Sequence, residues 1–402
     1  MKEDQNEMGL PMSWTWVKLR DTGKIISGGT PSTAIGEYWN GSINWISPSD
    51  LTGYKKKTIT KGAKSITELG LKNSSARLMP KGSVLFSSRA PIGYVVITAD
   101  IACTNQGFKS ISPNENVLSE FLYYFLLASK RNAEQVASGT TFKEISLTKF
   151  AELDFPLPPK PIQQSIISKI EELFSELDKG IENLLTVQQQ LKTYRQSVLK
   201  WAFEGRLTND DVKEGELPEG WKWMKIDEVT ISLDNKRQPI NKEERLKRQG
   251  DIPYYGANGR VGWINDYIFN EPLICVVEDE TFTGREIPFS YKIVGKSWVN
   301  NHAHVLKPKD DLNIDFLNYQ LYYYPFLRLT TGTTGRKKLT KNALMSAPIR
   351  VCSIKEQCDI VQEIERRLSV ANKMQETITQ SLQQSEALRQ SILKLAFEGR
   401  LV

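Results

Sequence analysis

The sequence predicts a mixed α+β protein in which two globular parts alternate with two long helices, as a pseudo-two-fold internal repeat. Three observations predict this fold. A 13-residue segment occurs twice, two long stretches are poor in helix breakers, and the remaining chain consists of short apolar runs separated by turn residues. At 402 residues, the chain is long enough for two or three domains with their own cores.

The repeat is clearest where RQSVLKWAFEGRL at 195–207 returns as RQSILKLAFEGRL at 389–401. Weaker matches lie upstream of it and pair Ile170-Glu171 with Ile364-Glu365, Gln164 with Gln357 after one residue of slippage, Gly139-Thr140-Thr141 with Gly332-Thr333-Thr334, Leu147-Thr148-Lys149 with Leu339-Thr340-Lys341, and Trp14-Thr15-Trp16 with Trp221-Lys222-Trp223. The chain is therefore a duplication, and its first half ends near Thr208.

The globular parts precede Pro156 and Pro348. There, apolar runs such as SVLFSSRAPIGYVVITAD and EPLICVVEDETFTG are broken by Gly, Pro, Asn and Ser, a pattern typical of strands and tight turns. We therefore expect a first head at residues 1–157 and a second head at 209–350. Helical regions are expected at 158–208 and 351–402.

The first helical region carries a heptad seam. Its main positions are Ile170, Leu177, Leu184, Leu191 and Val198, with Leu173, Val187, Tyr194 and Trp201 as companions and Gly180 as an interruption. In the second region, Ile364, Ala371, Met374, Ile378, Leu388, Ile392 and Leu395 keep the stripe, whereas Arg367, Ser381 and Ser385 interrupt it.

A helix of about 40 residues is roughly 60 Å long, which is more than one small head can cover. The seam therefore predicts that the two helices pair as an intramolecular coiled coil. The alternative is that each helix packs only on its neighbouring head.

The distribution of charge favours a polyanionic ligand for the heads. The net charge is +6, yet residues 162–208 hold six basic and six acidic side chains, and residues 351–402 hold seven of each. The positive excess therefore lies outside the helices. Two basic heads on a paired rod would suit a ligand with two sites at a fixed distance, such as DNA half-sites about 34–36 Å apart.

Polar loops of the heads supply the candidate DNA contacts. Lys and Thr suit phosphates, while Arg, Asn and Gln suit base edges. The candidates are Lys55, Lys56, Lys57, Thr58, Ser87, Arg89, Asn105, Gln106, Thr140, Thr141 and Lys143 in the first head, and Asn258, Arg260, Arg285, Asn301, His302, Thr333, Thr334, Arg336 and Lys337 in the second. Singly, each also fits a solvated turn.

Enzyme and metal motifs are missing from the sequence. Gly295-Lys296-Ser297 lacks the glycine that a P-loop needs at position 290, and no Asn-Pro-Pro-aromatic or Gly-x-Ser-x-Gly segment occurs. His302 and His304 would share one strand face, but no third ligand adjoins them, so we expect no metal site. The four cysteines lack metal-ligand spacing and are expected to be buried thiols.

The order of head, Pro-Leu-Pro-Pro junction and long helix ending in AFEGRL, followed by a second such set, resembles the specificity subunit of type I restriction-modification systems. Besides the two AFEGRL ends, SSRAPIGYVVI with TNQGFK, PYYGANGRVGWI and WVNNHAHVL carry the resemblance, which covers essentially the whole chain. The second junction, SAPIRVCSIKEQ, departs from the proline-rich form of the first.

The resemblance implies that each head is a target-recognition domain that reads one half of a split, asymmetric sequence in double-stranded DNA. The helices would run antiparallel and fix the gap. Two adenine methyltransferase subunits would dock on them, and motor and nuclease subunits would join for cleavage. S-adenosylmethionine and ATP would be bound by these partners, so this chain would have no cofactor and no catalytic residue of its own.

No stretch approaches the roughly 20 apolar residues that span a bilayer, and the first residues lack the apolar core of a signal peptide. We therefore expect a cytoplasmic protein without membrane contact. Two other functions stay open at this point: a DNA-modifying enzyme, which the missing motifs disfavour, and a coiled-coil scaffold whose heads bind other ligands, such as peptides or sugars.

Overall fold

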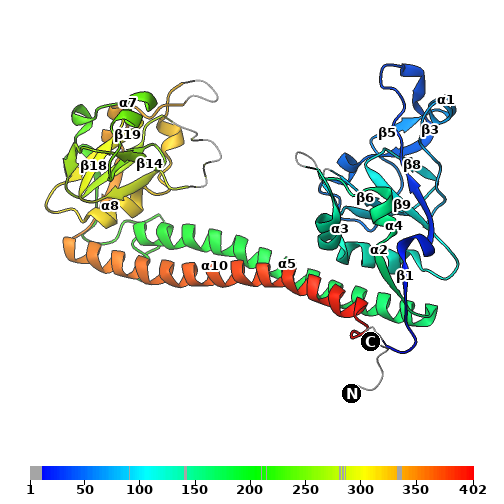
Figure 1. Ribbon diagram of the computed structural model, residues 1–402. Coiled ribbons are helices and arrows are strands. Elements are labelled where there is room, and N and C mark those ends of the chain that lie inside the picture. Colours follow the sequence, from blue (N-terminus) through cyan, green and yellow to red (C-terminus); the bar gives the residue numbers. More distant parts are fainter. Residues whose placement is uncertain are drawn as a thin grey trace. The chain divides into compact units, whose positions relative to one another are not determined.

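The computed structural model describes residues 11–89, 91–139, 143–209, 211–213, 215–279, 282, 285, 287–332 and 337–402. The chain divides into two compact units, the first made of residues 1–184 with 380–402 and the second of residues 185–379. The division falls inside both long helices. Each unit therefore contains one head and a segment of each helix (Figure 1).

The first head is built on two sheets. One has the order β2 (Gly23–Ser27), β9 (Phe108–Pro113), β6 (Val84–Ser87), β7 (Val95–Thr98) and β4 (Thr58–Ile59), and the other has the order β5 (Lys64–Ile66), β3 (Trp39–Ile46) and β8 (Ala102–Thr104). Short helices connect the strands: η1 (Leu19–Asp21), η2 (Gly36–Tyr38), η3 (Pro48–Leu51), α1 (Glu68–Lys72), α2 (Ser119–Ala128), α3 (Lys130–Val136) and α4 (Leu147–Ala151).

The second head repeats this plan. Its sheets have the orders β12 (Thr230–Ser232), β19 (Ala303–Pro308), β16 (Leu273–Val277), β17 (Ser290–Ile293), and β14 (Gly259–Ile264), β13 (Ile252–Gly256), β18 (Lys296–Val299), β15 (Phe269–Asn270). Its helices are α6 (Ile226–Val229), η4 (Asp234–Lys236), α7 (Lys242–Lys247), α8 (Ile314–Leu321), η5 (Phe326–Leu329) and α9 (Lys341–Met345).

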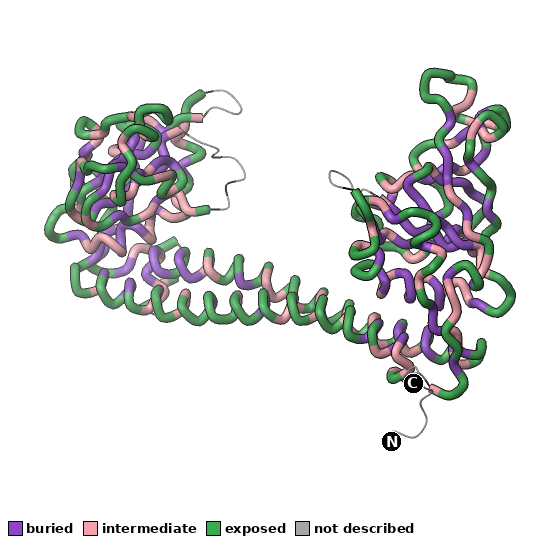
Figure 2. Tube along the Cα trace, in the orientation of Figure 1, coloured by how far each residue is buried: buried purple, intermediate pink, exposed green. Residues whose placement is uncertain are grey.

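The strand registers make the two heads directly comparable. β6 pairs with β9 so that Phe86 faces Lys109, and β16 pairs with β19 so that Val276 faces His304. The parallel pairs β3–β8 and β13–β18 correspond in the same way. In both heads the central strands are buried, and Figure 2 shows the buried positions gathered inside the sheets. The predicted duplication therefore extends to three-dimensional structure, although the loops have diverged.

A separate two-stranded sheet joins each head to a long helix. β1 (Thr15–Lys18) pairs with β10 (Asp154–Leu157), and β11 (Lys222–Lys225) pairs with β20 (Pro348–Val351). Trp16 thus faces Pro156, and Trp223 faces Arg350. The second junction therefore has the same pairing as the first, despite its different sequence.

Each long helix is fixed at its start by a buried glutamine. α5 (Lys160–Phe203) and α10 (Ile354–Phe397) are both 44 residues long. Gln163 and Gln357 lie three residues after the first residue of these helices and are fully buried. The match of Gln164 with Gln357 was therefore wrong by one residue, because Gln163 makes the equivalent contacts and needs no slippage.

The repeated AFEGRL sequence ends both helices in the same way. Gly205 and Gly399 have φ values of +76° and +68°, a left-handed conformation that glycine adopts without steric cost. The amide of Arg206 donates to the carbonyl of Trp201, and that of Arg400 donates to the carbonyl of Leu395. This Schellman motif explains why glycine stands at this place in both copies.

Within each unit, the helix segments run side by side. In the first unit, Arg389 of α10 forms an ion pair with Asp178 of α5 and lies over the ring of Phe174. In the second unit, Val198 of α5 shares a buried cluster with Ile360 and Ile364 of α10. Among the described residues, no helix has an apolar stretch long enough to cross a membrane.

Burial along the predicted seam differs between the two helices. On α5, Ile170, Leu191 and Val198 are buried, whereas the companion positions Tyr194 and Trp201 are each 37% exposed. On α10, Met374 and Leu388 are 45% and 51% exposed and therefore do not belong to the seam. The buried or half-buried positions instead follow the heptad Ile364, Ala371, Ile378, Ser385 and Ile392, so that Ser385 is a seam residue whose hydroxyl donates to the helix backbone.

The expectation of four buried thiols holds for three cysteines. Cys103, Cys275 and Cys352 are buried, and burial raises the pKa of each to about 12. Cys358 is exposed, because it lies on the outer face near the start of α10, where it accepts a hydrogen bond from Asn313.

Candidate nucleic-acid interface

In each head, an asparagine shapes the turn that precedes the central strand β9 or β19. The side chain of Asn105 accepts the amide of Gly107 at 2.8 Å, and that of Asn300 accepts the amide of His302 at 2.8 Å. These asparagines hold the turn, so the side chains displayed at its tip are those of Gln106 and Asn301, which are both exposed.

A second feature is the closure of the Gly-Thr-Thr loops. Ser138 and Glu144 exchange backbone hydrogen bonds across the first loop, and Thr331 and Lys338 do so across the second. The same closing strands bridge to the segments that follow β6 and β16, where Glu144 pairs with Arg89, and Lys338 pairs with Asp279. The described ends of the two loops are therefore closed in the same way.

The side chains at these equivalent positions differ in charge. In the first head, Glu144 lies 3.7 Å from Arg89 and 3.4 Å from Lys109, whose side chain is almost fully buried. In the second head, an acidic residue replaces Arg89 and a basic residue replaces Glu144. The charges across the loop base are therefore inverted between the heads.

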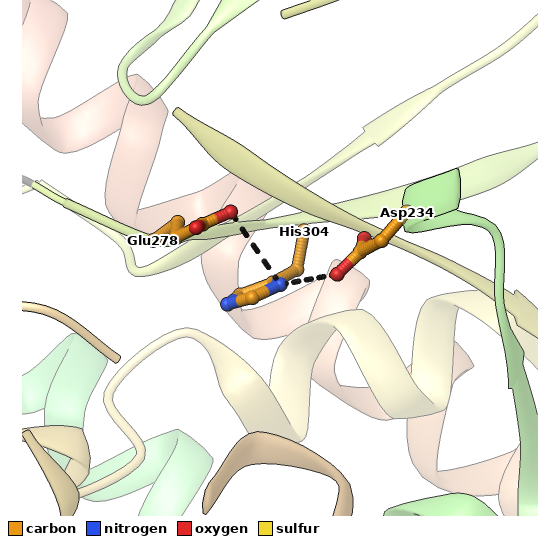
Figure 3. Close-up of side chains that lie close together, drawn as sticks. All are labelled: Asp234, Glu278 and His304. Carbon is orange, nitrogen blue, oxygen red and sulfur yellow. Dashed lines mark hydrogen bonds and ion pairs between the residues drawn. The ribbon is translucent and has the colours of Figure 1, made fainter. Parts of the chain in front are cut away.

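The second head holds a charged cluster at the base of this loop, drawn in part in Figure 3. Its members are Asp234, Arg237, Glu278, His304 and Lys338. His304 Nδ1 lies 2.6 Å from Asp234 Oδ2 and 3.7 Å from Glu278 Oε2. Arg237 forms ion pairs with both carboxylates, and Lys338 Nζ lies 2.9 Å from Glu278 Oε1.

Both carboxylates of this cluster are stabilised in the ionised form. Burial alone raises the pKa of Asp234, but hydrogen bonds from His304 and the Val305 amide, with the charge of His304, hold that pKa below its ordinary value. Burial likewise opposes ionisation of Glu278, and hydrogen bonds from Arg237 and Lys338 lower its pKa overall. The same contact raises the pKa of Lys338.

The two histidines do not form a pair. His304 is buried in the cluster, whereas the more exposed His302 places Nδ1 2.6 Å from Asp279 Oδ1. The expected lack of a third ligand needs correction, because folding brings Asp234 and Glu278 beside His304 with potential ligand atoms within 4.8 Å. Arg237 and Lys338 already neutralise these carboxylates, so we assign the cluster to ion pairing.

Other candidates fall into three groups. Lys55, Lys56, Thr58 and Lys143 are exposed. Asn258 and Arg285 are brought together by a 2.9 Å hydrogen bond, and Arg260 lies over the ring of Trp263. Thr140, Thr141, Thr333, Thr334 and Arg336 lie outside the described residues, so of the two loops only their ends, including Lys143 and Lys337, are described.

Two candidates are engaged inside the first unit. Lys57 Nζ lies 2.5 Å from Glu171 of α5. Ser87 is fully buried, where its hydroxyl donates to the Pro91 carbonyl and accepts the Tyr94 amide. Both side chains already have partners within the unit, so they are not among the residues proposed to contact DNA.

The repeated helix ends line a groove in each unit. In the first unit, Trp16 faces Gln390, Leu393, Lys394, Phe397 and Glu398. In the second unit, Trp223 faces Gln196, Leu199, Lys200, Phe203 and Glu204. These residues occupy the same places in the two copies of the 13-residue segment. Trp16 and Trp223 are 37% and 55% exposed, which is high for tryptophan.

Sequence reasoning missed Asp234, Arg237 and Glu278 as members of a common cluster. They lie in separate segments, and no spacing in the sequence connects them. The match between the two Gly-Thr-Thr segments was the one signal in the sequence that pointed to this cluster, because Lys338 closely follows the second of these segments. The grooves had a stronger signal, namely the near identity of the segments that line them.

Comparison with known proteins gives a consistent assignment. The family described as "Type I restriction modification DNA specificity domain" matches residues 11–187 and 218–384. The type I restriction enzyme MjaIX specificity subunit of Methanocaldococcus jannaschii is 37% identical over 231 residues, covering 55% of this chain and 52% of that protein. The EcoR124I/EcoR124II specificity subunit of Escherichia coli is 30% identical, with 46% and 47% coverage. The chain thus aligns with about half the length of these relatives.

Solved structures agree on the fold over nearly the whole chain. The HsdS subunit from Thermoanaerobacter tengcongensis matches with a TM-score of 0.60 and 18% identity, covering 97% of this chain and 98% of that one. A chain from a structural study of assembly and conformational transition of the type I R-M system matches with a TM-score of 0.69 and 19% identity, covering 97% and 99%. At these identities, the likeness shows the fold alone.

Proposed function

The chain belongs to the family of type I restriction modification DNA specificity domains, and from this we propose that it is the DNA-recognising subunit of a type I restriction-modification complex. In this proposal, each head reads one half of a split, asymmetric target in double-stranded DNA, and the chain itself carries out no chemical step.

One observation carries the proposal. The heads share a backbone framework but display different side chains at equivalent places: Gln106 corresponds to Asn301, Gly107 to His302, and Arg89 to Asp279. Base pairs differ in the hydrogen-bond donors and acceptors that they present, so a constant frame with different polar groups suits two different half-sites. Asn105 and Asn300 would hold the turns from which these groups project.

The long helices would set the number of base pairs between the two halves. Each helix contributes to both units, so a change in helix length would move one head along the DNA relative to the other. The division into heads at 1–157 and 209–350 and helical regions at 158–208 and 351–402 is part of this proposal.

We further propose that two adenine methyltransferase subunits dock on the chain, one at each groove. The helix-end side of the two grooves is lined by matching residues, including Leu393 and Phe397 in one and Leu199 and Phe203 in the other, whereas the head side differs. The matching side supports the same kind of occupant in both grooves, and exposed tryptophans are typical of protein interfaces. Motor and nuclease subunits would join this assembly for cleavage, with S-adenosylmethionine and ATP bound by the partners in the cytoplasm.

The deciding experiment is co-expression with the cognate adenine methyltransferase subunit, followed by single-molecule sequencing of host DNA to map methylated adenines. We expect one split motif with a constant gap. A continuous motif would refute two-headed recognition. Methyl transfer by the purified chain alone would refute a non-catalytic role, and a complex that binds no DNA would favour a scaffold.

A further inference from the structure

In the charged cluster of the second head, both ring nitrogens of His304 make short polar contacts. His304 Nε2 lies 2.8 Å from the Leu339 carbonyl oxygen, which only accepts hydrogen bonds, so Nε2 carries a proton. Nδ1 lies 2.6 Å from the Asp234 carboxylate, which Arg237 and the Val305 amide also contact. His304 therefore links a side chain on one segment to the backbone of another.

Arg237 extends the same network. Its guanidinium donates to Glu278 and to the Ala303 carbonyl at 2.8 Å, and it contacts Asp234. Its Nε donates to the Asp234 carbonyl. Neutralised buried carboxylates are strongly held, because removing one partner would leave an uncompensated charge away from water. Arg237 and His304 therefore bind together chain segments that are distant in sequence.

Those segments lead directly to the residues proposed to face DNA. Glu278 precedes Asp279, the partner of His302. Ala303 and His304 follow Asn301 and His302 at the turn, and Lys338 and Leu339 follow Lys337 at the end of the second Gly-Thr-Thr loop. The amide of Leu339 donates to the Glu278 carbonyl at 2.8 Å. This hydrogen bond connects the end of the second Gly-Thr-Thr loop to the segment that follows β16.

The first head fills the equivalent positions with other residues. The strand registers and loop closures place Ser88 where the second head has Glu278, Lys109 where it has His304, and Glu144 where it has Lys338. There, within the part of the chain that the structure describes, Lys109 and Arg89 both form an ion pair with Glu144. The five-membered cluster is thus particular to the second head.

We propose that Arg237 and His304 are positioning residues for DNA recognition by the second head. They fix the turn carrying Asn301 and His302 against the loop end carrying Lys337, so that these groups meet the second half-site in one geometry. The inference rests on the proposed function, because it concerns the same recognition surface.

The test measures half-site selectivity with the methyltransferase complex of the full chain. Duplexes carry the wild-type motif or one changed base pair in either half. For Arg237→Met and His304→Leu, we expect discrimination in the second half to fall about tenfold while discrimination in the first half stays constant, because the loss of a well-placed base contact has effects of this order. Arg237→Lys, which keeps the charge, should restore part of the loss.

Three further variants separate positioning from general folding. Lys307 lies on β19, the strand that also carries His304, and forms an exposed ion pair with Glu271. Lys307→Gln breaks this ion pair and should leave discrimination in both halves unchanged. Lys338→Glu should lower selectivity in the second half. The triple variant Glu278→Ser, His304→Lys, Lys338→Glu introduces the residue types of Ser88, Lys109 and Glu144 of the first head and should recover selectivity relative to Lys338→Glu.

Unchanged second-half discrimination in Arg237→Met and His304→Leu would overturn the inference. So would an equal loss in both halves that follows a lower unfolding temperature and is not restored by Arg237→Lys. If the wild-type complex methylates no split motif, the proposed function itself fails, and that result is visible before any variant is compared.

Discussion

Gln163 and Gln357 make the same three hydrogen bonds in the two units. The amide nitrogen of Gln163 donates to the carbonyls of Asn116 and Pro158, and its oxygen accepts the Leu118 amide. Gln357 donates to Asp311 and Cys352 and accepts the Asn313 amide. Each glutamine thereby ties the loop before α2 or α8 to the start of a long helix, using backbone groups that would otherwise lack partners.

Replacing either glutamine by leucine should destabilise its unit. Gln163→Leu leaves two carbonyls and one amide without their partner, and we expect a loss of about 2 kcal/mol in the free energy of unfolding. Chemical denaturation followed by circular dichroism would measure it. Gln190→Leu, at an exposed position of α5, is the control and should change little; equal effects of the two variants would contradict the role assigned to Gln163.

Alanine should have opposite effects at two glycines near and within α5. At Gly205, φ is +76°, and a Cβ atom would lie 2.1 Å from Pro218 Cγ, so we expect Gly205→Ala to cost about 1–3 kcal/mol. Gly180 lies inside the helix with nothing within 4 Å of the added Cβ, so Gly180→Ala should stabilise by about 0.5–1 kcal/mol. Thermal melts of both variants give the comparison, and a shift of the same sign for both would refute it.

The grooves should be equivalent binding sites for the methyltransferase. Trp16→Ala and Trp223→Ala remove exposed side chains, so the chain should stay folded while each variant loses one of two bound subunits. Native mass spectrometry would count the subunits. The double variant should bind none at concentrations that saturate the wild type, whereas retention of two subunits by all three variants would exclude the grooves as docking sites.

Acid should weaken the second unit through its charged cluster. The pKa values of Asp234 and Glu278 are lowered from ordinary values of 3.8 and 4.5, so their contribution is fully present above about pH 5 and is lost as pH falls through the lower folded values. Urea midpoints measured from pH 7 down to pH 3 should fall more steeply for the wild type than for Asp234→Asn with Glu278→Gln. Parallel curves would show that the cluster does not set the acid limit.

Lengthening both helices by one heptad should widen the gap in the target. Insertions after Leu184 in α5 and after Thr379 in α10 add about 10 Å, or roughly three base pairs. Methylation mapping should then show the same two half-sites with a longer gap. A motif whose bases change while its gap stays constant would contradict the role proposed for the helices.

The sequence predicted the framework well because the framework is periodic. The change of pattern at Pro156 and Pro348 located the junctions with α5 and α10, and the heptad on α5 located its buried face. On α10, hydrophobicity was misleading: Met374 and Leu388 are apolar but exposed, whereas Ser385 lies at the seam because its hydroxyl is satisfied by the helix backbone. On α10, the heptad spacing of the residues therefore predicts the seam better than the polarity of their side chains does.

The interface was predictable only in part. Loop positions such as Asn105 and Gln106 were predicted from their residue types in polar loops of the head, but side-chain partners depend on long-range contacts. Lys57 is one example, since its partner Glu171 is 114 positions away on a helix. The cluster around His304 is another, because its members come from four segments that only the folded sheet brings together.

The helix α10 also determines the order in which the chain acquires its cores during synthesis. The second unit consists of residues 185–379, so all its parts have been made once that stretch leaves the ribosome. The first unit still lacks Ile392, Ala396 and Phe397 at that stage, although its core packs the ring of Phe397 against Phe121 and Phe125. Domains generally fold as they emerge, yet here the part translated first is the last to be completed, and a ribosome that stalls within α10 leaves an open apolar surface for chaperones.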